Sequence, residues 1–309
     1  MDLRQIEYFV SLYEDGNVTR AARRLNVVQP ALSMQIAKLE TEFGQKLFER
    51  TSQGMVPTAA GRTMYRLFLP VLRELAHARQ QMTSFGGQIS GRVSVGLLTS
   101  VTHSVLSDSL ARFAADYPEV EVSVAEGYTT TFVDWVTSGQ LDMAVINLPR
   151  RTVGLTVEEI LEEELVLVTG SGTTIPVASP VSFADLPRLK LVIPSKRHGL
   201  RGIIDSHAEA EGVDLAPRLE IDAIHSIADL VRKSDWVTVL PAIGVFRGLA
   251  DGSLRAHRIV APRIVRKLAL IHHPRRALTP AARKLAEVMA VDLVRAASAL
   301  EFSDPAGVS

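Results

Sequence analysis

The chain has 309 residues, of which 47% are hydrophobic, 22% charged and 6% aromatic, and its net charge is zero. This length and composition predict about two globular domains and exclude a mainly disordered protein. The apolar runs are only a few residues long, as in Leu165-Val166-Leu167-Val168, whereas a membrane-spanning helix needs about 20, so we expect no membrane span. With no cysteine and no secretory pattern at Met1-Asp2-Leu3-Arg4-Gln5, thiolate chemistry is excluded and a cytoplasmic location is expected.

Charge is distributed unevenly along the chain. Residues 1–90 carry 11 basic and 8 acidic side chains, residues 91–180 carry 4 and 12, and residues 181–309 carry 19 and 14. This asymmetry predicts segments with different partners. The small positive excess at the start is also what an ordinary solvated surface gives, so the geometry of motifs has to decide.

Three helices are predicted at the start of the chain. The first has a helical apolar face, and Asp15-Gly16-Asn17 supplies its stop and the next cap. The second covers Val18 to Leu25, and the third opens at Gln29-Pro30, where proline is tolerated in the first turn. Their predicted apolar faces are Leu3, Ile6, Phe9, Val10 and Tyr13, then Val18, Ala21, Ala22 and Leu25, then Leu32, Ile36, Leu39 and Phe43.

The second and third helices, joined by a short turn, form a helix-turn-helix pattern, although an ordinary helical hairpin looks the same. The third helix would turn Gln29, Pro30, Ser33, Met34 and Lys38 outward. Glutamine suits adenine or phosphate, serine is adaptable, and a methionine can touch a thymine methyl. Arg20 and Lys38 are predicted to contact phosphates, which positions the protein without specifying sequence, and Thr19 is a further predicted DNA-binding residue.

A small β-wing and a long helix are predicted next. Residues 44–57 alternate apolar and polar side chains around a glycine turn, so they resemble a wing that presents Arg50 and Gln53 to the minor groove or backbone. Pro57-Thr58 then caps a helix from about Ala59 to Phe85. Its apolar stripe needs a cover, and an antiparallel helix from a second subunit would supply one. Gly86-Gly87-Gln88 would end it as a hinge. The stripe consists of Leu67, Val71, Leu75, Ala78 and Met82.

Several fixed spacings in this region resemble the amino-terminal signature of LysR-type transcriptional regulators. They are Leu3-Arg4-Gln5-Ile6 through Phe9, Asn17 to Leu25, Gln29-Pro30-Ala31-Leu32-Ser33, Ile36 through Leu39-Glu40, Leu47-Phe48-Glu49-Arg50, and Pro57-Thr58-Ala59-Ala60-Gly61. The resemblance covers about 65 residues. It implies a winged helix-turn-helix domain over residues 1–58 and a linker and dimerisation helix with its hinge over residues 59–90. Met34-Gln35 falls at variable recognition positions, which leaves the operator sequence open.

From residue 91 onward, short β-rich runs alternate with amphipathic segments of helical length, which predicts an α/β architecture with mostly parallel strands. The strand-like runs are Arg92–Leu98, Val120–Val124, Met143–Ile146, Leu165–Val168, Leu189–Ile193, Trp236–Leu240 and Leu268–Ile271. The helical segments lie near 103–116, 130–138, 199–212, 224–234, 241–250 and 280–300.

Ligands of open α/β sheets bind beyond the carboxyl ends of strands, and three loops at such places carry suitable groups. Hydroxyl groups follow the first and second strands, at Ser100, Thr102, Thr129 and Thr130. The third loop holds Ser195 and His198 with the cations Lys196, Arg197 and Arg201. Ordinary helix capping explains any single loop, but three together favour a small, anionic ligand such as a carboxylate.

This region resembles the effector-binding domain of the same family, which has two periplasmic-binding-protein-like α/β lobes. The resemblance rests on Leu141-Asp142-Met143-Ala144-Val145 after Gly139 and on Leu240-Pro241. It implies that lobe one covers about 91–160 and 266–301, that lobe two covers about 161–265, and that the effector lies between them. The closing helix led by Thr279-Pro280 suggests kinship with the branch that contains the nitrogen assimilation control protein.

No catalytic or cofactor motif is present: G-x-G-x-x-G, G-x-x-x-x-G-K-[ST], H-E-x-x-H and G-x-S-x-G are all missing. His272-His273 would point to opposite faces of a strand, so we expect no metal site. An enzyme would need a nucleophile, an acid-base pair or a metal set, and an exported solute-binding module would lack the helix-turn-helix. His198 and His225 are suited to hydrogen-bond a ligand, but a surface or capping role is the favoured interpretation for each.

The sequence therefore predicts a regulator rather than an enzyme, with no cofactor. By resemblance its partners are double-stranded DNA at a pseudo-palindromic operator, a small anionic metabolite, a second copy in a homodimer or homotetramer, and RNA polymerase as a further candidate. Effector binding would close the lobes and alter the bend of the operator.

Overall fold

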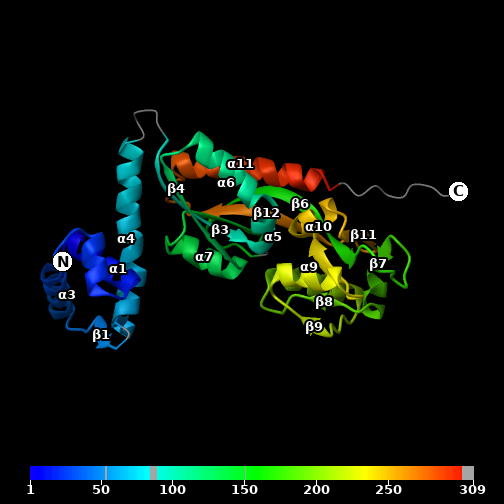
Figure 1. Cartoon of the computed structure of the whole chain (residues 1–309), viewed down its shortest axis with the longest axis horizontal. Helices are drawn as coiled ribbons and strands as arrows, with labels where there is room; N and C mark the ends of the chain where they lie inside the picture. Colours follow the sequence, from blue (N-terminus) through cyan, green and yellow to red (C-terminus); the bar gives the residue numbers. More distant parts are fainter. Residues whose placement is uncertain (53, 84–88, 150, 301–309) are drawn as a thin grey trace. The chain divides into compact units, whose positions relative to one another are not determined.

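The computed structural model describes residues 1–52, 54–83, 89–149 and 151–300 (Figure 1). The chain divides into two units near residue 87, and each is described by itself. Among the described residues, no helix is both long and apolar enough to cross a membrane.

The first unit opens with the three predicted helices, α1 (Leu3–Asp15), α2 (Val18–Arg24) and α3 (Gln29–Phe43). Gly16 ends α1 in the left-handed region at φ 57°, and the Asn17 side chain accepts a hydrogen bond from the backbone N–H of Arg20 to cap α2. These two residues set the turn because glycine adopts positive φ without strain and asparagine is a preferred N-cap. The predicted helices, stop and cap are therefore confirmed.

The predicted wing is a two-stranded antiparallel hairpin of β1 (Phe48–Thr51) and β2 (Gly54–Pro57). Its second strand is fixed to the end of α1, because the backbone N–H of Met55 donates to the carbonyl of Gly16 at 2.8 Å. Gly54 has a φ of 121°, and a Cβ there would lie 2.5 Å from the Gly16 oxygen. Glycine is therefore required at this contact.

Helix α4 (Ala59–Thr83) follows the wing, as predicted. Residues 84–88, which include the predicted end at Phe85 and the hinge Gly86-Gly87-Gln88, lie outside the described residues. Three members of the predicted apolar stripe, Leu67, Val71 and Met82, are 60%, 45% and 70% exposed. A stripe of this kind on one chain leaves apolar surface that a partner can cover.

Two residues of the apolar faces predicted for the first three helices are exposed rather than buried, and one of them is Leu3 at the start of α1, which is 43% exposed. Phe43 is 44% exposed, whereas Leu32, Ile36 and Leu39 on the same stripe are buried. Phe43 is the last residue of α3, directly before its glycine C-cap, so its side chain lies at the edge of the core. Its ring centroid is 6.4 Å from that of Phe68.

The second unit contains a mixed sheet with the strand order β4-β3-β5-β12-β6-β11-β7. An additional strand, β10, also pairs with β6. One half holds β3 (Gly91–Leu98), β4 (Val120–Gly127), β5 (Met143–Asn147) and β12 (Val265–His272). Its helical segments are α5 (Thr99–Val101), the π-helical η2 (Thr102–Leu106), α6 (Ser107–Asp116), α7 (Thr129–Thr137) and α11 (Pro280–Ser298). Helices α6 and α11 cover one side of this half and α7 the other (Figure 1). These strands and helices enclose one hydrophobic core, and we call this half of the unit lobe one.

A second hydrophobic core defines lobe two. It holds β6 (Thr156–Gly170), β7 (Val181–Ser182), β8 (Val192–Ile193), β9 (Leu219–Glu220), β10 (Thr238–Pro241) and β11 (Leu254–Val260). Its helices are η3 (Phe183–Arg188), α8 (Gly199–Glu211), α9 (Ile224–Arg232), η4 (Ala242–Val245) and α10 (Phe246–Ala250).

The prediction of mostly parallel strands is wrong. β3 pairs in parallel with β4 and β5, β7 with β11 and β8 with β9, but β12 is antiparallel to both β5 and β6, and β6 is antiparallel to β10 and β11, so the strands are mixed in direction. The reason is that β6 and β12 are long strands shared by the two lobes: β12 pairs with β5 in lobe one and with the first half of β6, whose second half enters the core of lobe two. These two strands, which both lobes share, run antiparallel to each other.

Several element boundaries also differ from the expected ones. The helix predicted near 103–116 begins at Thr99 and contains the π-helical turn, and the segment near 241–250 is two short helices. Strand β8 is shorter than the predicted Leu189–Ile193, and β11 was not predicted. β11 escapes a search for apolar runs because three of its seven residues, Arg255, His257 and Arg258, are basic or imidazole side chains.

Candidate DNA interface and interlobe cluster

Helix α3 separates an apolar face from a polar one. Leu32, Ile36 and Leu39 are buried in the core of the first unit. The outward residues are all exposed, as their spacing predicted: Gln29, Pro30, Ser33, Met34 and Lys38. Five exposed side chains on a helix whose other face is fixed form a rigid surface suited to a DNA groove. Their individual contacts stay predictions.

The neighbouring predicted contacts are exposed too. The Thr19 hydroxyl donates to Gln29 Oε1 at 3.4 Å, which joins the start of α2 to the start of α3. Arg20 is exposed and its Nη2 donates to the carbonyl of Asp15 at 2.5 Å. Arg50 is exposed on β1, whereas Gln53 lies outside the described residues.

Glu40, on the inner side of α3, holds the wing in place and was not predicted to do so. Its Oε1 accepts the backbone N–H groups of Leu47 at 2.9 Å and Phe48 at 3.4 Å, and its Oε2 lies 2.7 Å from Lys46 Nζ. Burial alone would raise the pKa of Glu40, but these donors outweigh burial and hold the pKa below its ordinary value. A glutamate shortly before a predicted wing is the only sequence signal for this role.

Helix α4 is fixed to α1 by an aromatic contact. Tyr13 and Tyr65 stack with ring centroids 3.9 Å apart, and the Tyr65 hydroxyl donates to Glu14 Oε1 at 3.2 Å. Burial, together with the negative charge of Glu14, raises the pKa of Tyr65 to about 12. The ring stacking and this hydrogen bond therefore fix α4 to α1 within the unit that presents the exposed face of α3.

In the second unit, Arg266 on β12 donates hydrogen bonds to three side chains near the junction of the lobes. Its Nε donates to Glu163 Oε1 at 2.8 Å, its Nη1 to Asn147 Oδ1 at 3.3 Å and its Nη2 to the Ser100 hydroxyl at 2.9 Å. The side chains of Arg266 and Glu163 are only 2% and 6% exposed, so this is a buried ion pair. We call Ser100, Asn147, Glu163 and Arg266 the interlobe cluster.

Residues from the two lobes meet beside this cluster. A Cβ on Gly199, the first residue of α8, would lie 3.2 Å from Asn147 Nδ2 and 3.8 Å from the Thr129 hydroxyl. That hydroxyl is buried and has no hydrogen-bond partner among the described residues. His198 caps α8 by accepting the N–H of Leu200 at Nδ1, and its ring lies 5.4 Å from that of Tyr128. Burial lowers the pKa of His198, and the charge of Arg266 lowers it further against the opposing effect of Asp222.

The other predicted effector residues are placed unevenly. Ser100 belongs to the interlobe cluster, and Thr129 and His198 lie beside it. The Thr102 hydroxyl contacts Glu126 Oε2 at 2.5 Å and the carbonyl of Thr99 at 2.9 Å. Thr130 is exposed, and the backbone N–H of Ser195 donates to Asp222 Oδ1 at 2.9 Å. Effector contact by each of them stays a prediction.

Arg201, the remaining predicted effector residue, is engaged within lobe two. Its guanidinium is buried and donates to Asp205 at 2.6 Å, to Glu220 at 2.6 Å and to the carbonyl of Pro194 at 3.1 Å. These partners raise the pKa of Arg201 despite its burial. A cation committed to two carboxylates inside lobe two does not supply free positive charge to a ligand. The guanidinium at the interlobe cluster is that of Arg266 instead.

Sequence reasoning missed Arg266, Asn147 and Glu163. A signal existed for two of them, because a charge at an inward position of a strand must be paired. Arg266 precedes the apolar run of β12, and Glu163 lies within the acidic start of β6. Their register cannot be read from either segment alone. Among the described residues, no group of three or more His, Asp or Glu side chains is placed to hold a metal ion.

Comparisons with known proteins agree with this architecture. Residues 3–62 match the family model for bacterial regulatory helix-turn-helix proteins of the lysR family, and residues 86–292 match the model for the LysR substrate binding domain. The chain is 30% identical over 292 residues to the nitrogen assimilation regulatory protein nac of Klebsiella aerogenes, covering 94% of each chain. It is 27% identical over 289 residues to the transcriptional dual regulator OxyR of Escherichia coli, covering 94% of this chain and 95% of the other.

Solved structures show the same fold. Full-length OxyR from Pseudomonas aeruginosa superposes with a TM-score of 0.74 at 23% identity and covers 95% of this chain and 94% of its own. The LysR family regulator CbnR has a TM-score of 0.67 at 20% identity, with coverage of 96% and 99%. The helix-turn-helix, the two-lobed domain and the level of identity lead to one conclusion: the chain is a transcriptional regulator of the LysR family, related to the nac branch, and not an enzyme.

Proposed function

We propose that this regulator acts as a homodimer or homotetramer on a pseudo-palindromic operator in the cytoplasm. In this proposal residues 1–58 form the DNA-binding domain, residues 59–90 the linker and residues 91–309 the effector-binding domain. The lobe boundaries are those given above. The observation that carries the proposal is the exposed polar face of α3, on which Gln29 and Ser33 lie while the opposite face of the helix is buried in the core. The related regulator CbnR has been solved in complex with its target DNA.

The proposed division of labour follows from the chemistry of the exposed side chains. Gln29, Ser33 and Met34 read base edges, whereas Thr19, Arg20, Pro30, Lys38, Arg50 and Gln53 contact or approach the backbone. Base readers discriminate sequences, and phosphate contacts add affinity to all sequences through counterion release.

This division is tested by fluorescence anisotropy with an operator and a scrambled duplex over a salt series. We expect Gln29→Ala to weaken operator binding by about 1–3 kcal/mol and to leave scrambled DNA almost unchanged. Lys38→Ala should weaken both duplexes and reduce the salt slope by about one unit. Ser33→Ala and Arg50→Ala form the matched second pair. Equal losses on both duplexes from all four variants would contradict the assignment.

For the effector, we propose a small anion bound between the lobes, and with it a change in the bend of the operator. Two features support an anion: the buried Thr129 hydroxyl, which has no hydrogen-bond partner among the described residues, and the positive end of the dipole of the 13-residue helix α8, whose first residue lies beside that hydroxyl. Ser100, Thr102, Thr130, Ser195 and His198 are the further proposed contacts. No cysteine is present, so the response does not use a thiol.

The test is isothermal titration of the full chain with a panel of carboxylates and their amides. A carboxylate that binds at least about tenfold more tightly than its amide supports the proposal, since a charge-assisted bond is roughly twice as strong as a neutral one. If an amide or another neutral compound binds and no carboxylate does, the proposed charge of the effector is wrong.

A further inference from the structure

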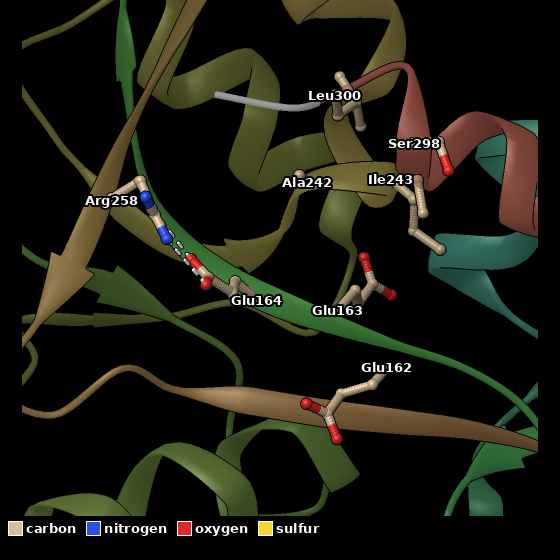
Figure 2. A pocket seen from close by; sticks show the side chains of 9 residues that line it. Glu162, Glu163, Glu164, Ala242, Ile243, Arg258, Ser298 and Leu300 are labelled. Atoms are coloured by element: carbon tan, nitrogen blue, oxygen red, sulfur yellow. Dashed lines mark hydrogen bonds and ion pairs between the residues drawn. The ribbon is translucent and has the colours of Figure 1, made fainter. Parts of the chain in front are cut away.

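The hollow on β6, where the two lobes join, is lined by charges that are compensated within the fold (Figure 2). Its volume is about 460 Å³, and three glutamates of β6 line it. Each of them lies beside a basic side chain: Glu162 beside Lys267, Glu163 beside Arg266 and Glu164 beside Arg258. The hollow therefore does not indicate a charged ligand.

The start of α3, in contrast, carries an apolar side chain at a position where helices favour a polar one. Val28 is the N-cap residue, and its side chain makes no capping hydrogen bond. The two preceding helices are capped by side chains, α1 by Asp2 and α2 by Asn17. Serine, threonine, asparagine and aspartate are preferred at N-caps, and valine is among the least favourable residues there. Local helix stability therefore does not explain Val28.

Packing in the core does not explain Val28 either. The residue is 69% exposed, which is more than Met34 at 52% or any other large hydrophobic residue in the range 1–52. Its neighbour Val27 packs against the core of the first unit, and Leu32, one turn later, is completely buried. A single exposed valine is ordinary on a protein surface, so its meaning depends on what that surface contacts.

Val28 lies on the surface that faces DNA in the proposed function. It directly precedes Gln29 and Pro30, which are exposed, and the first residues of the second helix in a helix-turn-helix are those that reach base edges. Its backbone is fixed, because its carbonyl accepts the N–H groups of Ala31 at 3.0 Å and Leu32 at 3.3 Å. A β-branched side chain has few rotamers, so little conformational entropy is lost when it contacts a partner.

We propose that Val28 reads a thymine of the operator through the C5 methyl group in the major groove. The valine side chain has no donor, acceptor or charge, so it gains nothing at a phosphate, and the thymine methyl is the apolar group that a base edge offers there. The rule that favours a polar N-cap is broken where a contact to DNA needs an apolar group. The inference rests on the proposed recognition of DNA by α3 and adds a specificity-determining residue to it.

Met34, the exposed apolar side chain already proposed to read a base edge, contacts a different base pair. It lies six residues further along the chain, which is roughly 9 Å at about 1.5 Å per helical residue. Successive base pairs are about 3.4 Å apart. The contacts of Val28 and Met34 should therefore fall at separate positions of one half-site, so substitution of the DNA distinguishes them.

The test starts from a duplex selected from a random-sequence library with the full-length chain. Each thymine is then replaced by deoxyuridine, which lacks only the C5 methyl group, and binding is measured by fluorescence anisotropy. For the wild type, we expect one such replacement per half-site to weaken binding by about fourfold, the effect of losing one buried methyl group. Val28→Ala should bind the thymine and uracil duplexes of that position equally, whereas Met34→Ala should still discriminate between them.

Two further variants separate loss of the contact from loss of folding. Val28→Ser supplies a preferred N-cap residue, so the start of α3 is at least as stable as in the wild type, and it should also lose the uracil effect. Val291→Ala is the matched control, because it removes the same two methyl groups from a valine that is 56% exposed on α11, and it should keep the effect. The salt slope of Val28→Ala should equal that of the wild type, since no phosphate contact is lost.

The outcomes separate this inference from the proposed function. Unchanged uracil effects at every thymine in both Val28→Ala and Val28→Ser, or no uracil effect in the wild type, would overturn the role of Val28 while operator recognition stands. Equal binding of the selected duplex and a scrambled duplex by the wild type would instead contradict the proposed function, and the role of Val28 with it.

Discussion

The outward face of α3 and the interlobe cluster both consist of polar side chains, but those of α3 are exposed to water and those of the cluster are buried. On α3, Gln29, Ser33 and Lys38 are exposed, and their stability cost is small because water satisfies them. In the interlobe cluster, Arg266 and Glu163 are buried and satisfy each other together with Ser100 and Asn147. Substitutions on the outward face of α3 can therefore change DNA specificity at little cost in stability. At the interlobe cluster, any response to a ligand also changes the stability of the fold.

The largest effect is expected from Arg266→Ala, because it leaves the Glu163 carboxylate buried without its cation. We expect a loss of about 3–5 kcal/mol in the free energy of unfolding of the second unit. Urea unfolding followed by tryptophan fluorescence measures this, since both tryptophans, Trp135 and Trp236, lie in that unit. Arg263→Ala is the matched control, with a 62% exposed side chain and an expected loss below about 1 kcal/mol. Equal losses would remove the contrast between buried and exposed charges.

A smaller effect per chain is expected from Leu67→Glu, which tests whether the exposed stripe of α4 is covered by a second chain. Leu67 is 60% exposed, and burying such a side chain contributes about 1.5–3 kcal/mol. Sedimentation equilibrium should show a marked rise in the dissociation constant of the oligomer. Arg66→Glu, one position off the stripe, should change it little. If both variants assemble like the wild type, α4 is not the interface.

The smallest effect is expected from Glu40→Gln. This substitution tests how much a partly buried carboxylate contributes in the first unit, where the residues on the outward face of α3 are exposed. We expect a loss of about 1–2 kcal/mol, with faster amide hydrogen exchange at Leu47 and Phe48. The control is Glu42→Gln, whose carboxylate pairs with the amino terminus at the surface.

The same residue predicts a pH dependence. The folded pKa of Glu40 lies below its ordinary value of 4.5, so the folded state favours the ionised form. Its stabilising contribution is therefore complete above pH 4.5 and is lost as the pH falls through the folded pKa. Acid titration of unfolding free energy should show a steeper loss below pH 4.5 for the wild type than for Glu40→Gln. Parallel curves for the two proteins would contradict this.

The sequence by itself determined the helices of the first unit, the wing, the outward face of α3 and the α/β nature of the rest. These features depend on local rules: helical periodicity, the Gly16 stop, the Asn17 cap and the alternation of short apolar runs. Phe43 shows the limit of such rules, because a periodic position at the end of a helix does not have to meet the core.

Only the tertiary structure decided the direction of the strands and the chemistry between the lobes. Arg201 has the charge that sequence reasoning sought, yet its neighbours in space, Asp205 and Glu220, already neutralise it. Arg266 was overlooked because its partners Ser100, Asn147 and Glu163 are more than a hundred residues away along the chain. Pairing of buried charges depends on the register of long antiparallel strands, and that register is set by packing across the whole unit rather than by any local pattern.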